Sequence, residues 1–173
     1  MKRRHVVLVG LPGSGKTTVG RLVALRLGAP FADFDQLIEE RAGKPIDRIF
    51  AEDGEPAFRK LEATVGAEQL TGAPTVLAPG GGYLQDAVQR RQALNLGYLV
   101  YLMTSPSVAA RRLEHSHSRP LLKGFEPTLR LHQLLEQRRG VYLEAQGRVT
   151  TDVLNPQAVA DEVAQLARTH GGW

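Results

Sequence analysis

The chain has 173 residues, with 22 Lys and Arg against 18 Asp and Glu and 42% hydrophobic residues. This composition is ordinary for a globular protein, and the length predicts a single domain over residues 1–173. The absence of cysteine excludes a disulfide framework, a thiolate metal site and a cysteine nucleophile. Because no apolar run approaches the roughly 20 residues of a membrane span, we expect a cytoplasmic protein without a membrane partner.

The excess of basic residues raises the question of nucleic-acid binding. These residues are scattered along the chain, and their densest cluster is the short run at positions 2–4. A nucleic-acid binder typically shows a continuous basic face with interleaved aromatic residues, whereas aromatic residues make up 6% of this chain. Arginine is also well suited to small anions such as carboxylates and phosphates. The charge pattern therefore favours small anionic ligands over nucleic acid.

Short apolar, β-rich runs alternate with helical patterns, which is typical of a parallel sheet covered by helices. The strand at 98–103 is apolar throughout and is expected near the centre of the sheet. We expect strands at 5–9, 31–34, 75–78, 98–103 and 148–153, and helices at about 15–27, over most of 36–70, at 108–113 and 128–143, and from Pro156 onward. The sequence thus predicts the α/β class.

Residues 114–127 fit neither pattern. They contain two prolines, two histidines, Gly124 and the pair Leu121-Leu122. We expect an ordered but movable loop, and the alternative is an ordinary surface loop whose arginine, Arg119, is solvated.

Residues 10–17 carry the strongest motif in the chain. They read Gly-Leu-Pro-Gly-Ser-Gly-Lys-Thr, the Gly-x4-Gly-Lys-Thr pattern of a P-loop, with a predicted strand before and a helix after. The glycines let backbone N–H groups surround phosphate oxygens, and the helix N-terminus adds partial positive charge. Lys16 is predicted to reach the β- and γ-phosphates of ATP, and the Thr17 hydroxyl to bind Mg²⁺. A glycine-rich turn that contains Lys-Thr by chance is the alternative.

A P-loop alone does not distinguish a kinase from a GTPase or an ATPase motor. The chain leaves little room for the extra domains of a motor, and it contains no Asn-Lys-x-Asp string to recognise guanine. A small-molecule kinase is therefore the leading class.

Two carboxylates, Asp33 and Asp35, lie at the end of the second predicted strand. If the strand continues that far, its period of two places both on one face, at the strand ends where ligands bind in open parallel sheets. One carboxylate can then hold a metal ion or its water, while the other accepts the proton of an attacking hydroxyl. The alternative is that Asp35 caps the helix that follows it.

Glu55, Arg59 and Glu62 share one face of a predicted helix, because their spacings are four and three residues. Taken alone, this pattern is typical of a solvated salt-bridge ladder. The glycine triplet at 80–82 follows the third predicted strand. It can bring bare backbone close to a ligand or can form a flexible turn, and alone it is a weak signal.

Arg138 lies on an apolar helical stripe, and Tyr142 continues that stripe one turn later. A cation on a buried stripe needs an anion. That anion is either an internal carboxylate or a ligand, and the spacing does not decide between them. The apolar members of the stripe are Leu131, Leu134 and Leu135.

Together these motifs resemble shikimate kinase, a family in the nucleoside-monophosphate-kinase branch of P-loop proteins. The resemblance covers nearly the whole chain, and its most specific part is the string Gly-Glu-x-x-Phe-Arg-x-x-Glu combined with the glycine triplet. It implies a three-layer P-loop fold with a five-stranded parallel sheet flanked by helices, a helical substrate-binding region at about 33–62 and a mobile lid at about 114–127. The matching strings are Gly10–Thr18, Asp33-Phe-Asp35, residues 49–62, Gly80–Gly82, Arg119-Pro120-Leu121 and Arg138-x-x-x-Tyr142.

The resemblance also implies an activity: ATP-dependent phosphorylation of shikimate to shikimate 3-phosphate in aromatic amino acid (chorismate) biosynthesis. It implies Mg²⁺ as cofactor, ATP and shikimate as small-molecule partners, no nucleic acid or membrane partner, and a monomer. By the same resemblance the catalytic residues are Asp35 (the base), Lys16 and Arg119, and the metal site is Thr17 with Asp33 acting through water. The implied ATP-binding residues are Gly13, Ser14, Gly15, Lys16, Thr17, Thr18, Arg112, Arg119 and Pro156. The implied substrate-binding residues are Asp35, Arg59, Gly80, Gly81, Gly82 and Arg138, with Glu62 orienting Arg59.

Two rival classes are weighed beside this interpretation. A gluconate-type kinase shares the P-loop and a carboxylate substrate, and the acceptor-side strings argue against it. A non-catalytic domain that senses shikimate or nucleotide is the second rival, and the presence of Lys16, Asp35 and Arg119 argues against it. One departure from the family pattern is Leu154, where some members carry a basic residue before Asn155-Pro156 near the adenine.

Overall fold

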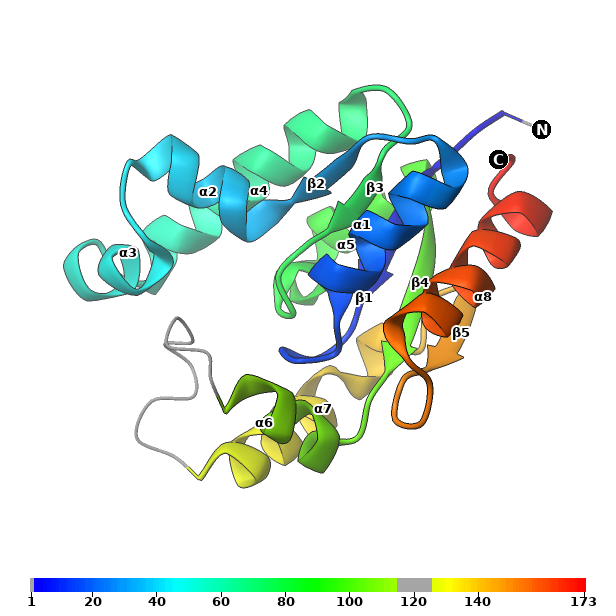
Figure 1. The fold of residues 1–173 in the computed structure, drawn as a ribbon. Helices are drawn as coiled ribbons and strands as arrows, with labels where there is room; N and C mark the ends of the chain where they lie inside the picture. The colour runs from blue at the N-terminus through cyan, green and yellow to red at the C-terminus, as the bar shows by residue number, and fades with distance from the viewer. Residues whose placement is uncertain (1, 115–125) are drawn as a thin grey trace.

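The computed structural model describes residues 2–114 and 126–173. Within these ranges the chain forms a five-stranded parallel sheet with helices on both faces (Figure 1). The strand order is β2-β3-β1-β4-β5, which confirms the predicted α/β fold class. The predicted lid residues Arg119, Leu121, Leu122 and Gly124 lie outside the described residues. The strands are β1 (His5–Val9), β2 (Phe31–Asp33), β3 (Val76–Ala78), β4 (Gly97–Met103) and β5 (Gly147–Thr150).

Alternate residues of a strand point to opposite faces of the sheet. Each inner strand therefore contributes to two apolar clusters, one on each face, and a different set of helices packs on each cluster. Val6 and Leu8 of β1 belong to the apolar cluster that includes residues of α1 (Lys16–Leu27) and α8 (Pro156–His170). Val7 and Val9 belong to the larger cluster on the other face. That cluster includes residues of α2 (Phe34–Ala42), α3 (Ile46–Glu52), α4 (Glu55–Thr71), α5 (Ala87–Leu96), α6 (Pro106–Leu113) and α7 (Pro127–Tyr142).

Figure 1 shows α2, α3 and α4 grouped at one side of the sheet, and α6 beside α7 near the loop that precedes α1. This grouping leaves the loops at the carboxyl ends of the strands between two sets of helices. A short 3-10 helix, η1 (Tyr83–Gln85), follows the glycine triplet. None of the helices in residues 2–114 and 126–173 is long and apolar enough to cross a membrane.

Two strands end earlier than the sequence predicts. The second strand ends at Asp33 and does not reach Asp35, so the condition under which both carboxylates would share one strand face is not met. The fifth strand ends at Thr150 rather than at Val153, and the side chain of Val153 is exposed. By contrast, β4 is buried along nearly its whole length and lies between β1 and β5, as its apolar sequence predicts.

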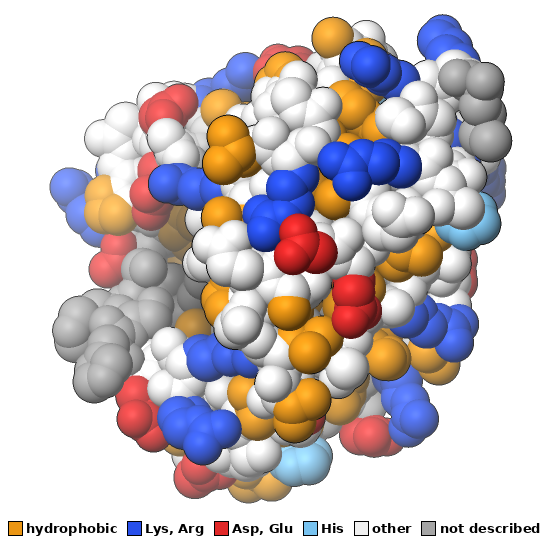
Figure 2. Space-filling model, turned by 45° about the vertical axis from the view of Figure 1, so that its right-hand side comes forward, with side chains coloured by type: hydrophobic (Ala, Val, Ile, Leu, Met, Phe, Trp, Pro, Cys, Tyr) orange, Lys and Arg blue, Asp and Glu red, His pale blue; other side chains and the backbone are white. Residues whose placement is uncertain are grey.

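On the face shown in Figure 2, Lys and Arg side chains lie scattered among acidic, apolar and other groups rather than in one basic patch. This distribution agrees with the scatter of basic residues along the sequence.

Candidate active site

The loop between β1 and α1 has a backbone that requires glycine at particular positions. Gly13 and Gly15 have φ angles of 81° and 93°, in the left-handed region that other residues rarely adopt. A Cβ atom at Gly13 would also lie 2.6 Å from the carbonyl oxygen of Ala109 on α6. The Nζ atom of Lys16 donates hydrogen bonds to the carbonyl oxygens of Gly10 and Leu11, both at 2.9 Å. The loop, the ammonium and the start of α1 together form a cradle suited to phosphate groups.

A cleft of about 450 Å³ runs along this loop. One end contains Asp35 and the first two glycines of the triplet, and the other contains Leu154 and Pro156. The lining of the cleft thus joins the phosphate-binding loop to the glycine triplet on one side and to the start of α8 on the other. Of the predicted site residues, it brings together Gly13, Ser14, Gly15, Lys16, Thr17, Thr18, Asp33, Asp35, Gly80, Gly81, Arg112 and Pro156.

Asp33 links the phosphate-binding loop to α2. Its Oδ1 atom accepts hydrogen bonds from the backbone N–H groups of Asp35, at 3.0 Å, and Gln36, at 3.4 Å. Its Oδ2 atom accepts a hydrogen bond from the Thr17 hydroxyl. Asp33, not Asp35, is therefore the N-cap of α2, and the alternative interpretation of Asp35 as a cap is also wrong.

The cap places Asp35 in the first turn of α2, with its carboxylate facing the glycine triplet. A Cβ atom built on Gly80 would lie 3.7 Å from Asp35 Oδ1. Asp35 thus points into the acceptor end of the cleft from a helix rather than from a strand. A carboxylate in this position can accept a proton from a ligand hydroxyl.

Arg59 is held between two carboxylates on α4. Its Nη1 atom lies 2.8 Å from Oε2 of Glu62, and its Nη2 atom lies 3.1 Å from Oε1 of Glu55. The side chain of Glu55 is 53% exposed, whereas that of Glu62 is 1% exposed. The expectation of a solvated ladder is therefore wrong at the Glu62 end. Burial raises the pKa of the Glu62 carboxyl, the neighbouring Arg59 opposes this shift, and the nearby Asp35 adds to it.

Arg138 is buried on α7, as its position on the apolar stripe predicts, with 6% of its surface exposed. Its guanidinium group lies against the glycine triplet, where a Cβ atom on Gly81 would be 3.0 Å from Nη1. A Cβ atom on Gly82 would lie 3.2 Å from Arg138 Nη2 and 3.0 Å from Arg59 Nη1. The two guanidinium groups therefore converge on the triplet. Arg59, Gly82 and Arg138 line a second cavity, of about 370 Å³. This cavity adjoins the cleft at the triplet, because Gly80 and Gly81 line the cleft and Gly82 lines the cavity.

The Arg112 side chain lies at the edge of the cleft, where hydrogen bonds to Thr151 and Gly13 hold it. Its Nη2 atom donates to the carbonyl oxygen of Thr151 at 2.7 Å, and its Nη1 atom donates to the Thr151 hydroxyl at 3.1 Å and to the Gly13 carbonyl at 3.4 Å. Thr151 is buried, and its hydroxyl also bonds that of Thr104 at 2.6 Å. Sequence reasoning did not identify Thr151, because no motif marks it and it pairs with residues far along the chain.

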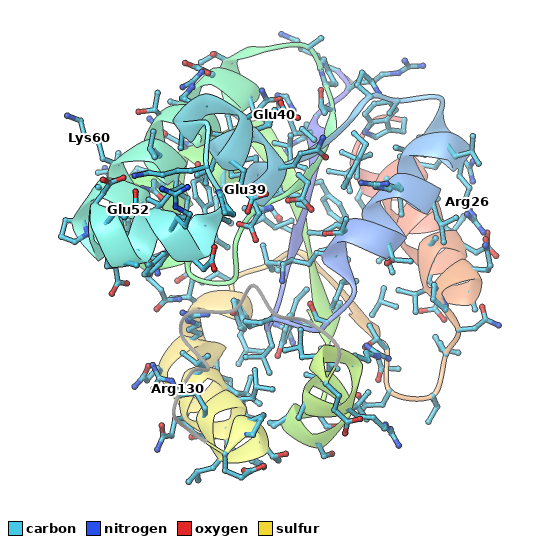
Figure 3. All side chains as sticks on the ribbon, turned by 60° about the vertical axis from the view of Figure 1, so that its left-hand side comes forward. Arg26, Glu39, Glu40, Glu52, Lys60 and Arg130 are labelled. Atoms are coloured by element: carbon cyan, nitrogen blue, oxygen red, sulfur yellow. The ribbon has the colours of Figure 1, made fainter. Side chains whose placement is uncertain are left out.

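Side chains far from the cleft are distinguishable in Figure 3. Lys60 points outward from α4, and Glu52 lies on α3, on the outer side of the α2–α4 group. Arg26 lies on α1 beside α8, where its Nε atom is 2.5 Å from Asp161 Oδ1. Because Lys60 is exposed, it serves below as a control for substitutions inside the cleft. Arg119, which the resemblance predicts to be catalytic, lies outside the described residues.

A phosphate cradle with a separate acceptor end beside it is the arrangement of a small-molecule kinase of the P-loop class. The family model of shikimate kinase matches residues 12–168. The chain belongs to the shikimate kinase family, and its activity is the ATP-dependent phosphorylation of shikimate.

Individual relatives agree with this assignment. A curated shikimate kinase from Symbiobacterium thermophilum is 41% identical over 170 residues, which cover 96% of this chain and 98% of that protein. The solved structure of a shikimate kinase from Acinetobacter baumannii in complex with shikimate has a TM-score of 0.93 at 36% identity, covering 97% of this chain and 94% of the other. A gluconokinase from Sinorhizobium meliloti 1021 has a TM-score of 0.58 at 24% identity, covering 96% and 95%. The likeness to the gluconokinase is one of fold alone.

Proposed function

We propose that the chain transfers the γ-phosphoryl group of ATP to the 3-hydroxyl of shikimate in a Mg²⁺-dependent reaction in the cytoplasm. The observation that carries the residue assignment is the convergence of the Arg59 and Arg138 guanidinium groups on the glycine triplet, which the Asp35 carboxylate also faces. Shikimate carries a carboxylate and hydroxyl groups, and paired arginines beside an acidic base suit such an acceptor. We also propose that the chain acts as one domain and as a monomer, without a nucleic-acid or membrane partner.

On the donor side, the N–H groups of residues 13–18 and the Lys16 ammonium bind the ATP phosphates. The Thr17 hydroxyl and the Asp33 carboxylate lie next to each other. This oxygen pair fits Mg²⁺, which binds through one or two protein oxygens, substrate phosphates and water. When bound, Mg²⁺ neutralises charge on the phosphate oxygens.

On the acceptor side, Arg59 and Arg138 bind the substrate carboxylate, and the triplet binds a hydroxyl group. Glu62 holds Arg59 in one orientation through its 2.8 Å ion pair. Asp35 accepts the proton of the attacking hydroxyl as the oxygen bonds to phosphorus and ADP leaves. At the far end of the cleft, Arg112 and Pro156 flank the adenine, and Arg119 of the lid meets the transferred phosphoryl group.

The test is a comparison of acceptors with the full-length protein. ADP formation is measured with ATP and Mg²⁺ in the presence of shikimate or gluconate, and the phosphorylated product is identified by mass. We expect shikimate-dependent ADP formation that is lost in Lys16→Ala and retained in Lys60→Ala, whose side chain points away from the cleft. ADP formation with gluconate alone would overturn the proposal.

A further inference from the structure

We propose that Tyr142 is a positioning residue for the acceptor site, and that its hydroxyl fixes the peptide unit between Gly81 and Gly82 in the orientation that binds shikimate. This inference rests on the proposed function and assigns a role to a residue outside the site described above. Tyr142 lies one helical turn after Arg138 on α7, and its hydroxyl donates a 2.7 Å hydrogen bond to the carbonyl oxygen of Gly81.

Each carbonyl group of the triplet has a hydrogen-bond donor. The Gly80 carbonyl accepts a hydrogen bond from the backbone N–H of Tyr83, and the Gly82 carbonyl accepts one from the backbone N–H of Gln85, both at 3.0 Å. Both bonds lie within the turn that forms η1. The middle carbonyl, that of Gly81, is instead bonded by the Tyr142 side chain from another element. The local turn therefore accounts for the two outer carbonyls, and α7 holds the middle one.

Glycine has no Cβ atom, so its own sterics do not fix the backbone at this position. A donor from another element is therefore needed to hold the peptide unit in one orientation. Three consecutive glycines can rotate their peptide planes at little steric cost. A trans peptide unit is planar, with its C=O and N–H groups pointing in opposite directions. The bond to the Gly81 carbonyl therefore also sets the direction of the Gly82 N–H group, next to the two converging guanidinium groups.

The Tyr142 side chain is itself held firmly. It is 1% exposed, and its ring centroid lies 5.2 Å from that of Tyr101 on β4. Burial raises the pKa of its hydroxyl to about 12, so the group remains a hydrogen-bond donor throughout the pH range of the reaction. One helix thus carries both Arg138 and the anchor of the triplet, and their separation is fixed by the helical repeat.

The test is steady-state kinetics of Tyr142→Phe, which removes the hydroxyl and keeps the ring. We expect the KM for shikimate to rise roughly three- to tenfold, which is the change in affinity that corresponds to the loss of one hydrogen bond. The KM for ATP should stay within about twofold, because the phosphate-binding loop is shaped by its own glycines. Tyr101→Phe is the matched control, since it removes a hydroxyl from the adjacent ring, and it should leave both constants unchanged.

A purely structural role would lower the unfolding temperature of Tyr142→Phe without a selective change in the KM for shikimate, and that result would overturn the inference. An inactive wild-type protein would instead refute the proposed function. NMR relaxation dispersion of the Gly81 and Gly82 amides measures their motion directly in the wild-type protein, so this test does not require the variant. We expect no microsecond-to-millisecond exchange at these amides in the ligand-free wild-type protein, and clear exchange there would also overturn the inference.

Discussion

The phosphate-binding end and the acceptor end of the cleft obtain their shape from different sources. The first is formed by consecutive residues between β1 and α1, with glycine φ angles and backbone groups setting its geometry. The second takes its groups from α2, α4, the loop before η1 and α7. Its shape depends on long side chains, a largely buried ion pair and the hydrogen bond of one tyrosine.

This difference determines how each end should respond to substitution. At the phosphate end the backbone carries much of the binding, so single side chains there act mainly on transfer. At the acceptor end a side chain either binds the carboxylate or acts on the reacting hydroxyl. Substitutions at the acceptor end should therefore separate binding from chemistry.

The largest effect is expected for Asp35→Asn, which keeps the shape of the side chain and removes its basicity. The turnover number should fall by about 10²–10⁴, the usual contribution of a general base, while shikimate affinity stays near the wild-type value. Asp47→Asn, at a partly exposed position in the first turn of α3, is the control. A wild-type turnover number in Asp35→Asn would assign the proton transfer to another group.

Arg138→Ala tests the carboxylate-binding side of the comparison. Loss of a desolvated, charge-assisted contact costs about 2–5 kcal/mol, so the KM for shikimate should rise roughly 30-fold or more. The KM for ATP should change far less. Arg139→Ala removes an exposed arginine from the next position of α7 and should be close to wild type. Equal increases in both KM values would mean that the two ends of the cleft are not independent.

Glu62→Gln tests the buried carboxylate of the acceptor end through the pH dependence of stability. The raised pKa means that the folded protein holds this proton more tightly than the unfolded chain. That contribution is fully present below the ordinary value of 4.5 and is lost as the pH rises through the raised value. Relative to wild type, the unfolding free energy of Glu62→Gln should therefore increase from pH 4.5 to 7 in urea titrations.

The control for this titration has the opposite sign. Arg41 lowers the pKa of the exposed Glu68 carboxyl. Below the ordinary value of 4.5, Glu68→Gln should therefore lose stability relative to wild type as the pH rises, and above 4.5 the difference should stay constant. A pH-independent difference between Glu62→Gln and wild type would show that burial of Glu62 does not shift its titration.

The smallest effect is expected for Glu55→Gln. Glu55 contacts the same guanidinium group as Glu62, but its side chain is half exposed. Exposed ion pairs contribute only about 0–1 kcal/mol, so the KM for shikimate should change less than about fivefold and less than in Glu62→Gln. A larger effect in Glu55→Gln would reverse the assignment of the buried carboxylate as the partner that orients Arg59.

The contrast between the two ends also explains what could be predicted from the sequence. The P-loop was recognisable because its residues are contiguous and local geometry determines their conformation. The burial of Arg138 followed from helical spacing alone. The second strand was expected to end at residue 34 and the next helix to begin at about 36, but Asp33 caps α2, so the strand ends at Asp33 and the helix begins at Phe34. Asp35 therefore reaches the cleft from a helix rather than from a strand. The burial of Glu62 and the Arg112–Thr151 contact arise from tertiary packing, which no local pattern records.

The most direct test of the division between binding and chemistry is calorimetric titration of shikimate into three proteins without nucleotide: wild type, Asp35→Asn and Arg138→Ala. The account predicts that Asp35→Asn binds shikimate with nearly wild-type affinity and that Arg138→Ala loses roughly 30-fold or more. The contradicting result is Arg138→Ala with wild-type affinity and Asp35→Asn without measurable binding, since it would place recognition of the acceptor on the carboxylate rather than on the arginines.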